Sequence, residues 1–267
     1  MGNVFDDVLR NIDKSKASDR QMSNIWLLFY FFPIISSVIF VGFTIFSVLS
    51  VASTSYPFIS PDEYSNIEFF SEFTYILSLF LLTLLAFFLV NLILTYELVK
   101  RRNSHFVRQN LLFNDLMVDF KSLGEHKGIN EGTNLLTANK ILNEAKVTEN
   151  MKVPVLWAVL SAFIPFVSWF VNYFLMKDFY DHERREGIFW DNLGNILNNF
   201  GVNFSVPSRT EIIPNRSFGL YLILTIITVG LFGIYWIHIL LRDPNTHFKY
   251  HIEIENSLKN SLSSISK

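Results

Sequence analysis

The fold is decided by residues 73–99, which read FTYILSLFLLTLLAFFLVNLILTYELV. The only Asp, Glu, Lys or Arg in this run is Glu97, close to its end. A run of more than about 18 apolar residues is long enough to cross the hydrocarbon core of a bilayer as a helix. The run lacks the apolar/polar alternation of barrel strands, so it predicts a transmembrane helix.

Three further stretches have the same character, at about 25–52, 153–176 and 218–241, and none contains Asp, Glu, Lys or Arg. The whole chain of 267 residues agrees with them, because 50% of its residues are hydrophobic and 17% are charged. Soluble domains carry about 25% charged residues. We therefore predict an all-α polytopic membrane protein with four transmembrane helices.

Lys and Arg residues set the predicted orientation, because they concentrate in cytoplasmic segments. Of the 22, 17 lie in residues 1–24, 100–152 and 242–267, and 5 lie in residues 177–217. In a cell membrane, four spans would place residues 1–24, 100–152 and 242–267 in the cytoplasm. Both termini would then be cytoplasmic. As an alternative, the third and fourth stretches are re-entrant hairpins broken at Pro165 and at Gly230 and Gly233. Residues 177–217 would then be cytoplasmic as well.

Amphipathic segments accompany the apolar stretches, because apolar residues recur at helical spacing beside each of them. Such helices lie on the membrane surface or pack together as a small cap. The chain is thus predicted to comprise an N-terminal amphipathic segment, a transmembrane hairpin, a cytoplasmic helical segment, two spans with a polar connection, and an amphipathic tail. Their respective bounds are 1–24, 25–99, 100–152, 153–241 and 242–267.

A short pattern follows three of the apolar stretches: a basic residue at the membrane exit and a histidine five positions later. The copies read KRRNSH at 100–105, KDFYDH at 177–182 and RDPNTH at 242–247, so the repeated histidines are His105, His182 and His247. A basic residue ends an apolar helix because its stem stays in lipid while its charge reaches water. The basic residues predicted to contact anionic lipid headgroups or a partner are Lys100, Arg101, Arg102, Arg108, Lys177 and Arg242.

The fourth stretch also carries a family resemblance. Residues 216–236 read RSFGLYLILTIITVGLFGIYW, and RDPNTHF follows at 242–248. This region resembles a widespread archaeal and bacterial family of integral membrane proteins, domain of unknown function 4234, whose members show a Thr-x-Gly-x-x-Gly-x-Tyr-Trp-like run and an Asp- and Asn-rich exit. The resemblance is confined mainly to residues 216–248. It implies a prokaryotic integral membrane protein and transfers no catalytic residue.

One constellation has the spacing of metal ligands. His247 and His251 are four residues apart, with Glu255 one turn further, so on a helix they share one face. Further ligands could come from His105, His182, Glu183 and Glu186. With four spans, however, His182 would lie on the opposite side of the membrane from His105 and His247. We therefore expect no metal and no other cofactor, and keep a metalloenzyme at the cytoplasmic interface as the lesser alternative.

The apolar stretches contain few groups suited to transport. A proton-coupled carrier needs ionisable groups at mid-membrane. Asn91, Asn172 and His238 lie near the predicted helix ends, where hydrogen bonds between helices account for them. No phosphate-binding loop, dinucleotide fingerprint or His-Glu-x-x-His box occurs.

The predicted function is therefore that of a non-catalytic accessory or scaffolding subunit. Its expected partners are membrane lipids and other membrane proteins or copies of itself, and its aromatic apolar surface favours such packing. An oligomeric channel or transporter is the alternative. Nucleic acid is not an expected partner, because the net charge is −2. The absence of cysteine excludes disulfides and thiolate chemistry.

Overall fold

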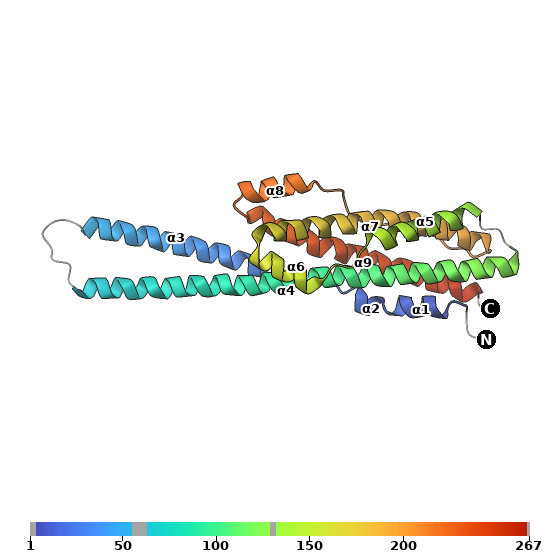
Figure 1. Cartoon of the computed structure of the whole chain (residues 1–267), viewed down its shortest axis with the longest axis horizontal. Helices are drawn as coiled ribbons and strands as arrows, with labels where there is room; N and C mark the ends of the chain where they lie inside the picture. The colour runs from blue at the N-terminus through green and yellow to red at the C-terminus, as the bar shows by residue number, and fades with distance from the viewer. Residues whose placement is uncertain (1–3, 55–62, 129–131, 266–267) are drawn as a thin grey trace. The chain divides into compact units, whose positions relative to one another are not determined.

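The computed structural model describes residues 4–54, 63–128 and 132–265 (Figure 1). Within these ranges no strand occurs, which confirms the all-α prediction. The helices form two compact units, residues 24–94 and residues 1–23 with 95–267, and α4 contributes to both. The elements are α1 (Asp6–Asp13), α2 (Ser15–Ser18), η1 (Asn24–Leu27), α3 (Leu28–Thr54), α4 (Glu63–Lys127), α5 (Gly132–Thr148), α6 (Pro154–Phe163), α7 (Pro165–Asn199), α8 (Phe218–Ile227) and α9 (Leu231–Ile265).

The unit of residues 24–94 pairs α3 with the first half of α4. The pairing is antiparallel: Tyr30 meets Phe87 edge-on at 5.2 Å between ring centroids, and Phe40 stacks on Phe80 at 4.5 Å. The Tyr30 hydroxyl donates to Asn91 Oδ1 (3.3 Å), which gives Asn91 a hydrogen bond between helices. The connection at 55–62, part of the predicted 25–99 hairpin, lies outside the described residues.

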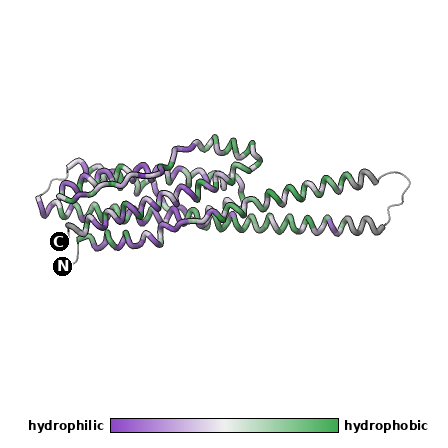
Figure 2. The backbone as a smooth tube through the Cα atoms, turned by 180° about the vertical axis from the view of Figure 1, so that it is seen from behind, coloured by the Kyte–Doolittle hydropathy of each residue, from purple (hydrophilic) through white to green (hydrophobic). Residues whose placement is uncertain are grey.

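Two helical segments are long and apolar enough to cross a membrane, Asn24–Leu49 and Phe70–Lys127. Figure 2 shows mainly hydrophobic colouring along the described parts of residues 24–94. Many of the apolar side chains described in this unit are exposed on the chain, as Val38 (67%) and Leu82 (62%) illustrate. Large exposed apolar surfaces mark contact with a membrane or with other proteins. The structure thus supports two candidate spans and does not show four.

The third apolar stretch is interrupted in the middle. Helix α6 ends at Phe163, Ile164 is extended, and α7 begins at Pro165. Proline suits the first turn of a helix but cannot continue one without losing a backbone hydrogen bond. The two arms fold back on each other, because Trp157 of α6 contacts Phe170 and Phe174 of α7.

The fourth apolar stretch is interrupted in the same way. Helix α8 ends at Ile227, and α9 begins at Leu231 after a turn in which Gly230 has φ +91°. Glycine adopts this backbone region without the steric cost of a side chain. The arms again fold together, with Tyr221 of α8 against Phe232 and Trp236 of α9. Each of these stretches is therefore a helical hairpin.

The second unit is a helical bundle with its own apolar core. The long helices α4, α7 and α9 continue past the junctions KRRNSH, KDFYDH and RDPNTH without a break. Beyond the junctions, Phe113 stacks on Phe189 at 3.5 Å, and α1 adds Val8 and Ile12 to the core. The amphipathic segments predicted from the sequence pack against one another here, so residues from 1–24, 100–152, 153–241 and 242–267 share one folded unit.

Candidate metal centre

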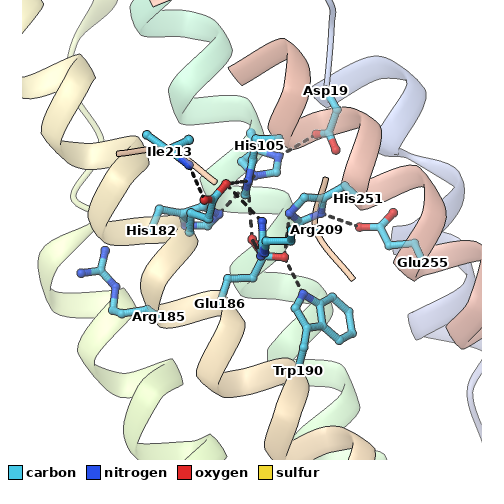
Figure 3. Close-up of polar contacts among 12 residues, drawn as sticks. Asp19, His105, His182, Arg185, Glu186, Trp190, Arg209, Ile213, His251 and Glu255 are labelled. Atoms are coloured by element: carbon cyan, nitrogen blue, oxygen red, sulfur yellow. Dashed lines mark hydrogen bonds and ion pairs between the residues drawn. The ribbon is translucent and has the colours of Figure 1, made fainter. Parts of the chain in front are cut away.

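The three histidines of the repeated junction meet inside the bundle. His105 of α4, His182 of α7 and His247 of α9 are all buried. The Nε2 atom of His105 lies 3.1 Å from that of His182 and 3.2 Å from that of His247. His251, one turn beyond His247, completes a group whose four ligand atoms lie within 4.8 Å of one another. Figure 3 shows His105, His182 and His251 around a common centre.

Each imidazole has a carboxylate at its outer nitrogen, Nδ1. The partner of His105 is Asp19 (2.9 Å), and that of His182 is Glu149 (2.8 Å). The other two pairs are His247 with Glu183 (3.1 Å) and His251 with Glu255 (3.3 Å). Metal-binding histidines commonly donate this second N–H to a carboxylate, which orients the ring.

Each of those carboxylates in turn contacts an arginine. Arg108 bridges Asp19 (2.6 Å) and Glu255 (2.7 Å), and Arg185 donates to Glu149 (2.8 Å). Arg209 lies 3.1 Å from Glu183. A carboxylate that is paired with a guanidinium can only accept hydrogen bonds. The Nδ1 atoms must then carry the protons, and for a neutral imidazole the inner Nε2 holds a lone pair.

Glu186 is the carboxylate on the inner side of the imidazoles. Its Oε1 lies 2.9 Å from His251 Nε2, and its Oε2 lies 3.4 Å from His247 Nε2. Trp190 Nε1 and Arg209 Nη2 also face Glu186. Glu186 is 1% exposed. A buried carboxylate beside the Nε2 atoms adds an oxygen ligand or a proton acceptor to the group.

The pKa values follow from burial and from these contacts. Burial opposes ionisation of Asp19, Glu149 and Glu186, but the neighbouring histidines and arginines lower each pKa below its ordinary value, to about 2 for Glu149. Burial lowers the pKa of His105 well below its ordinary value and that of His247 to about 4. The two imidazoles are therefore neutral at pH 7, as ligands must be.

His251 differs from the other imidazoles. Burial alone would lower its pKa, but Glu186 and Glu255 raise that pKa to about 9. Without a metal ion, His251 is thus an imidazolium held between two carboxylates. A metal cation bound at Nε2 would take the place of this proton.

The charges around the imidazoles match a divalent cation. The cluster contains five carboxylates, those of Asp19, Glu149, Glu183, Glu186 and Glu255. It contains three guanidiniums, those of Arg108, Arg185 and Arg209. With neutral imidazoles, two negative charges remain, and a dication cancels both.

The spacing of the nitrogens also fits. A zinc–nitrogen bond of 2.0–2.1 Å makes the edge of a tetrahedron of nitrogens about 3.3 Å long. The two closest Nε2 pairs, at 3.1 and 3.2 Å, are near this value. Two nitrogen lone pairs that face each other at such a distance repel. A cation between the two nitrogens attracts both lone pairs and offsets this repulsion.

The basic residues predicted to contact lipid headgroups fall into two groups. Lys100, Lys177 and Arg242 lie at the junctions, with Lys177 donating to Asn215 and Arg242 to Glu211. By contrast, the side chains of Arg101, Arg102 and Arg108 are buried in the bundle, each less than 6% exposed. The structure therefore does not present these three side chains to lipid headgroups.

The other predicted residues are spread along the helices. Asn172 and His238 are half-buried, in α7 and α9. The structure brings His247, His251 and Glu255 onto one face of α9, as their spacing predicts. His182 joins them because the α6–α7 hairpin returns the chain to the level of the other junctions. The expectation that His182 lies on the opposite side from His105 and His247 was wrong, because it assumed that the third stretch is a full span.

Sequence reasoning missed Asp19, Glu149, Arg185 and Arg209. Asp19, Glu149 and Arg209 lie in polar segments without a motif and reach the histidines only through the packing of distant parts of the chain, whereas Arg185 lies within one turn of His182 and its role depends on the distant Glu149. Glu183 and Glu186 could be found, because they follow His182 within one helical turn.

Comparison with known proteins adds no further assignment: no family model, no curated protein and no solved structure matches the chain. The resemblance of residues 216–248 to domain of unknown function 4234 stays a prediction.

The double ion pair of Arg108 provides a test of the cluster. Replacing Arg108 with methionine leaves Asp19 and Glu255 buried without their shared cation, so we expect a loss of about 3–5 kcal/mol in the free energy of unfolding. Arg10→Met is the matched control, because the Arg10–Asp7 pair is exposed and such pairs contribute about 0–1 kcal/mol. Denaturant unfolding in mild detergent with EDTA, followed by circular dichroism, measures both. Equal losses in the two variants would contradict the buried network.

Proposed function

We propose that the chain is a membrane metalloprotein in which His105, His182, His247 and His251 bind one divalent transition-metal ion. The observation that carries the proposal is the common direction of the imidazoles: each Nδ1 is held by a carboxylate, which leaves the Nε2 atoms facing one another. A structural role for buried histidines would not require one ring nitrogen from each of four imidazoles to lie within 4.8 Å of the others.

The donor set selects the class of ion. Imidazole nitrogen is a ligand for Zn²⁺, Fe²⁺, Ni²⁺ and Cu²⁺, whereas Mg²⁺ and Ca²⁺ prefer oxygen. Four imidazoles with the Glu186 carboxylate alongside therefore favour a first-row transition metal. Such an ion supplies Lewis-acid or redox chemistry when bound.

Of the functions that the sequence leaves open, the metalloenzyme is the one that this cluster favours. Glu186 is placed to act as a ligand or to hold a proton beside the ion, since its two oxygens face two Nε2 atoms. The scaffolding role and the channel or transporter stay predictions. The exposed apolar side chains of α3 and α4 are equally suited to lipid, so they favour neither.

We further propose that the two broken apolar stretches enter the membrane without crossing it. Helices α6 and α8 each have 10 residues, about 15 Å of helix against a hydrocarbon core of about 30 Å. The three junctions also lie at one level: Arg102 Nε is 2.8 Å from Asp178 Oδ2, and Arg101 Nη2 contacts the Leu241 carbonyl. Two spans and two re-entrant hairpins would place residues 177–217 on the same side as residues 100–152.

Metal content tests the proposal directly. We expect the detergent-purified chain, loaded with Zn²⁺ and desalted, to hold one ion per chain by elemental mass spectrometry. His105→Ala, His182→Ala and His247→Ala should each reduce retention at least tenfold, because each removes a ligand. Asp19→Asn should weaken the affinity by about 10–100-fold through loss of the Nδ1 partner.

His126→Ala is the matched control for these variants, since His126 is exposed on the same helix as His105. This variant should retain one ion per chain. All variants are compared as monodisperse peaks in size-exclusion chromatography, so that loss of fold is not read as loss of a ligand. A wild-type chain that holds no metal, or a His126 effect equal to that of His105, overturns the metal centre.

Cysteine labelling tests the topology, because the chain has no cysteine of its own. Ser208 is exposed in the connection between α7 and α8. With re-entrant hairpins, a membrane-impermeant maleimide should label Ser208→Cys from the same side as Asn260→Cys in the tail, and should label Ser55→Cys from the opposite side. Labelling of Ser208→Cys from the Ser55 side would instead indicate four full spans.

A further inference from the structure

The helices α4 and α7 run in the same direction past the histidine cluster. On α4, His105 meets His182 of α7, and eight residues later Phe113 stacks on Phe189. Residues four apart lie on the same face of a helix, so Gln109 faces α7 between these two contacts. The register therefore places Gln109 one helical turn beyond the repeated histidines, on the inner side of α4.

Glu186 of α7 and His251 of α9 lie at the same level as Gln109. Each of the three lies four positions after one of the repeated histidines. Glu186 Oε1 lies 2.9 Å from His251 Nε2, and Glu186 also accepts from Trp190. The three helices thus each contribute one side chain to a polar layer, which consists of Gln109, Glu186 and His251.

Gln109 is the unusual member of the polar layer. It is 1% exposed, and in the described part of the chain neither its Oε1 nor its Nε2 has a hydrogen-bond partner. A buried amide that makes no hydrogen bond is unfavourable. In native proteins such a group commonly has an ordered water molecule or an ion as its partner. Gln109 therefore indicates a partner from outside the chain.

The second oxygen of Glu186 points to the same partner. Glu186 Oε2 makes no hydrogen bond within the described residues, although it lies 3.4 Å from His247 Nε2 and 3.4 Å from Arg209 Nη2. The polar layer thus contains an amide and a carboxylate oxygen without hydrogen-bond partners. It lies one turn from the imidazole nitrogens proposed to bind the ion.

The surroundings limit the size of the partner. Gln109 and Glu186 are each 1% exposed and His251 is 0% exposed. The aromatic side chains of Phe189 and Trp190 are also fully buried on the far side of the layer. A water molecule is the smallest partner that both donates and accepts hydrogen bonds, and a buried water needs two to four polar partners. Gln109, Glu186 and a bound ion supply three.

We propose that Gln109 is the positioning residue for a water molecule bound to the metal ion, on the side of the ion that faces Glu186. This inference rests on the proposed metal centre. The water oxygen binds the ion, and its two hydrogens are donated to Gln109 Oε1 and Glu186 Oε2. Structural zinc sites have four protein ligands, whereas catalytic sites keep a position for water or substrate. The water makes the centre an open site, suited to reactions that consume water.

Cobalt loading of the full-length chain in mild detergent tests the water site. Visible absorption reports the coordination number, because four-coordinate Co²⁺ absorbs several-fold more strongly than five-coordinate Co²⁺. We expect wild type to show the weaker, five-coordinate spectrum. Gln109→Leu should still hold one ion per chain by elemental mass spectrometry, since Gln109 is not a ligand, but its absorption should rise at least twofold. Gln21→Leu, at an exposed glutamine, is the matched control and should leave the spectrum unchanged.

Two further readouts separate water binding from a purely structural role of Gln109. Water labelled with a magnetic oxygen isotope should broaden the electron paramagnetic resonance signal of cobalt in wild type and not in Gln109→Leu. Without metal, Gln109→Leu should melt at the wild-type temperature or above it, because the variant removes a buried amide that has no partner in the chain. All variants are compared as monodisperse peaks in size-exclusion chromatography.

The possible failures are distinguishable. A four-coordinate spectrum of wild type, or an identical spectrum of Gln109→Leu, overturns the water site while one retained ion per chain leaves the metal centre intact. A lower melting temperature of metal-free Gln109→Leu with an unchanged spectrum would also overturn it, and would indicate a hydrogen bond within the chain. A wild-type chain that holds no cobalt would overturn the metal centre itself.

Discussion

The level at which the helices of the bundle meet depends on one electrostatic constraint, the pairing of four buried imidazoles with four carboxylates. Each carboxylate is held by an arginine and accepts from an Nδ1–H. Uncompensated charges are expensive to bury, so the carboxylates, guanidiniums and imidazoles must be present together. Their joint consequence is a fixed orientation that directs the Nε2 atoms inward.

The helices provide the geometry that this constraint requires. His105, His182 and His247 each lie five residues after the basic residue that ends an apolar segment of α4, α7 or α9, so they lie at the same level when these segment ends are level. The hairpin breaks at Ile164–Pro165 and at Gly230 allow the third and fourth apolar stretches to return to that level. A helix that crossed the membrane fully would carry His182 away from the others. The candidate metal centre and the hairpins thus depend on each other.

Much of this could be predicted from local patterns. Apolar runs identify the helices, the repeated junction identifies His105, His182 and His247, and Pro165 and Gly230 indicate where the runs could break. The choice between a span and a hairpin could not be made locally, because both contain the same apolar residues. The roles of Asp19 and Glu149 depend on contacts across 86 and 33 residues of sequence, and no motif surrounds either residue. The burial of Arg101 could not be predicted either. In the sequence it is one basic residue of a cluster, and burial is a property of the packed bundle.

The central claim is that the four imidazoles form the ligand set of one metal ion. X-ray absorption spectroscopy of the zinc-loaded chain measures that ligand set directly. We expect a nearest shell of nitrogen at about 2.0 Å with outer-shell scattering from three or four imidazoles. A shell of oxygen ligands alone, without imidazole scattering, would contradict it.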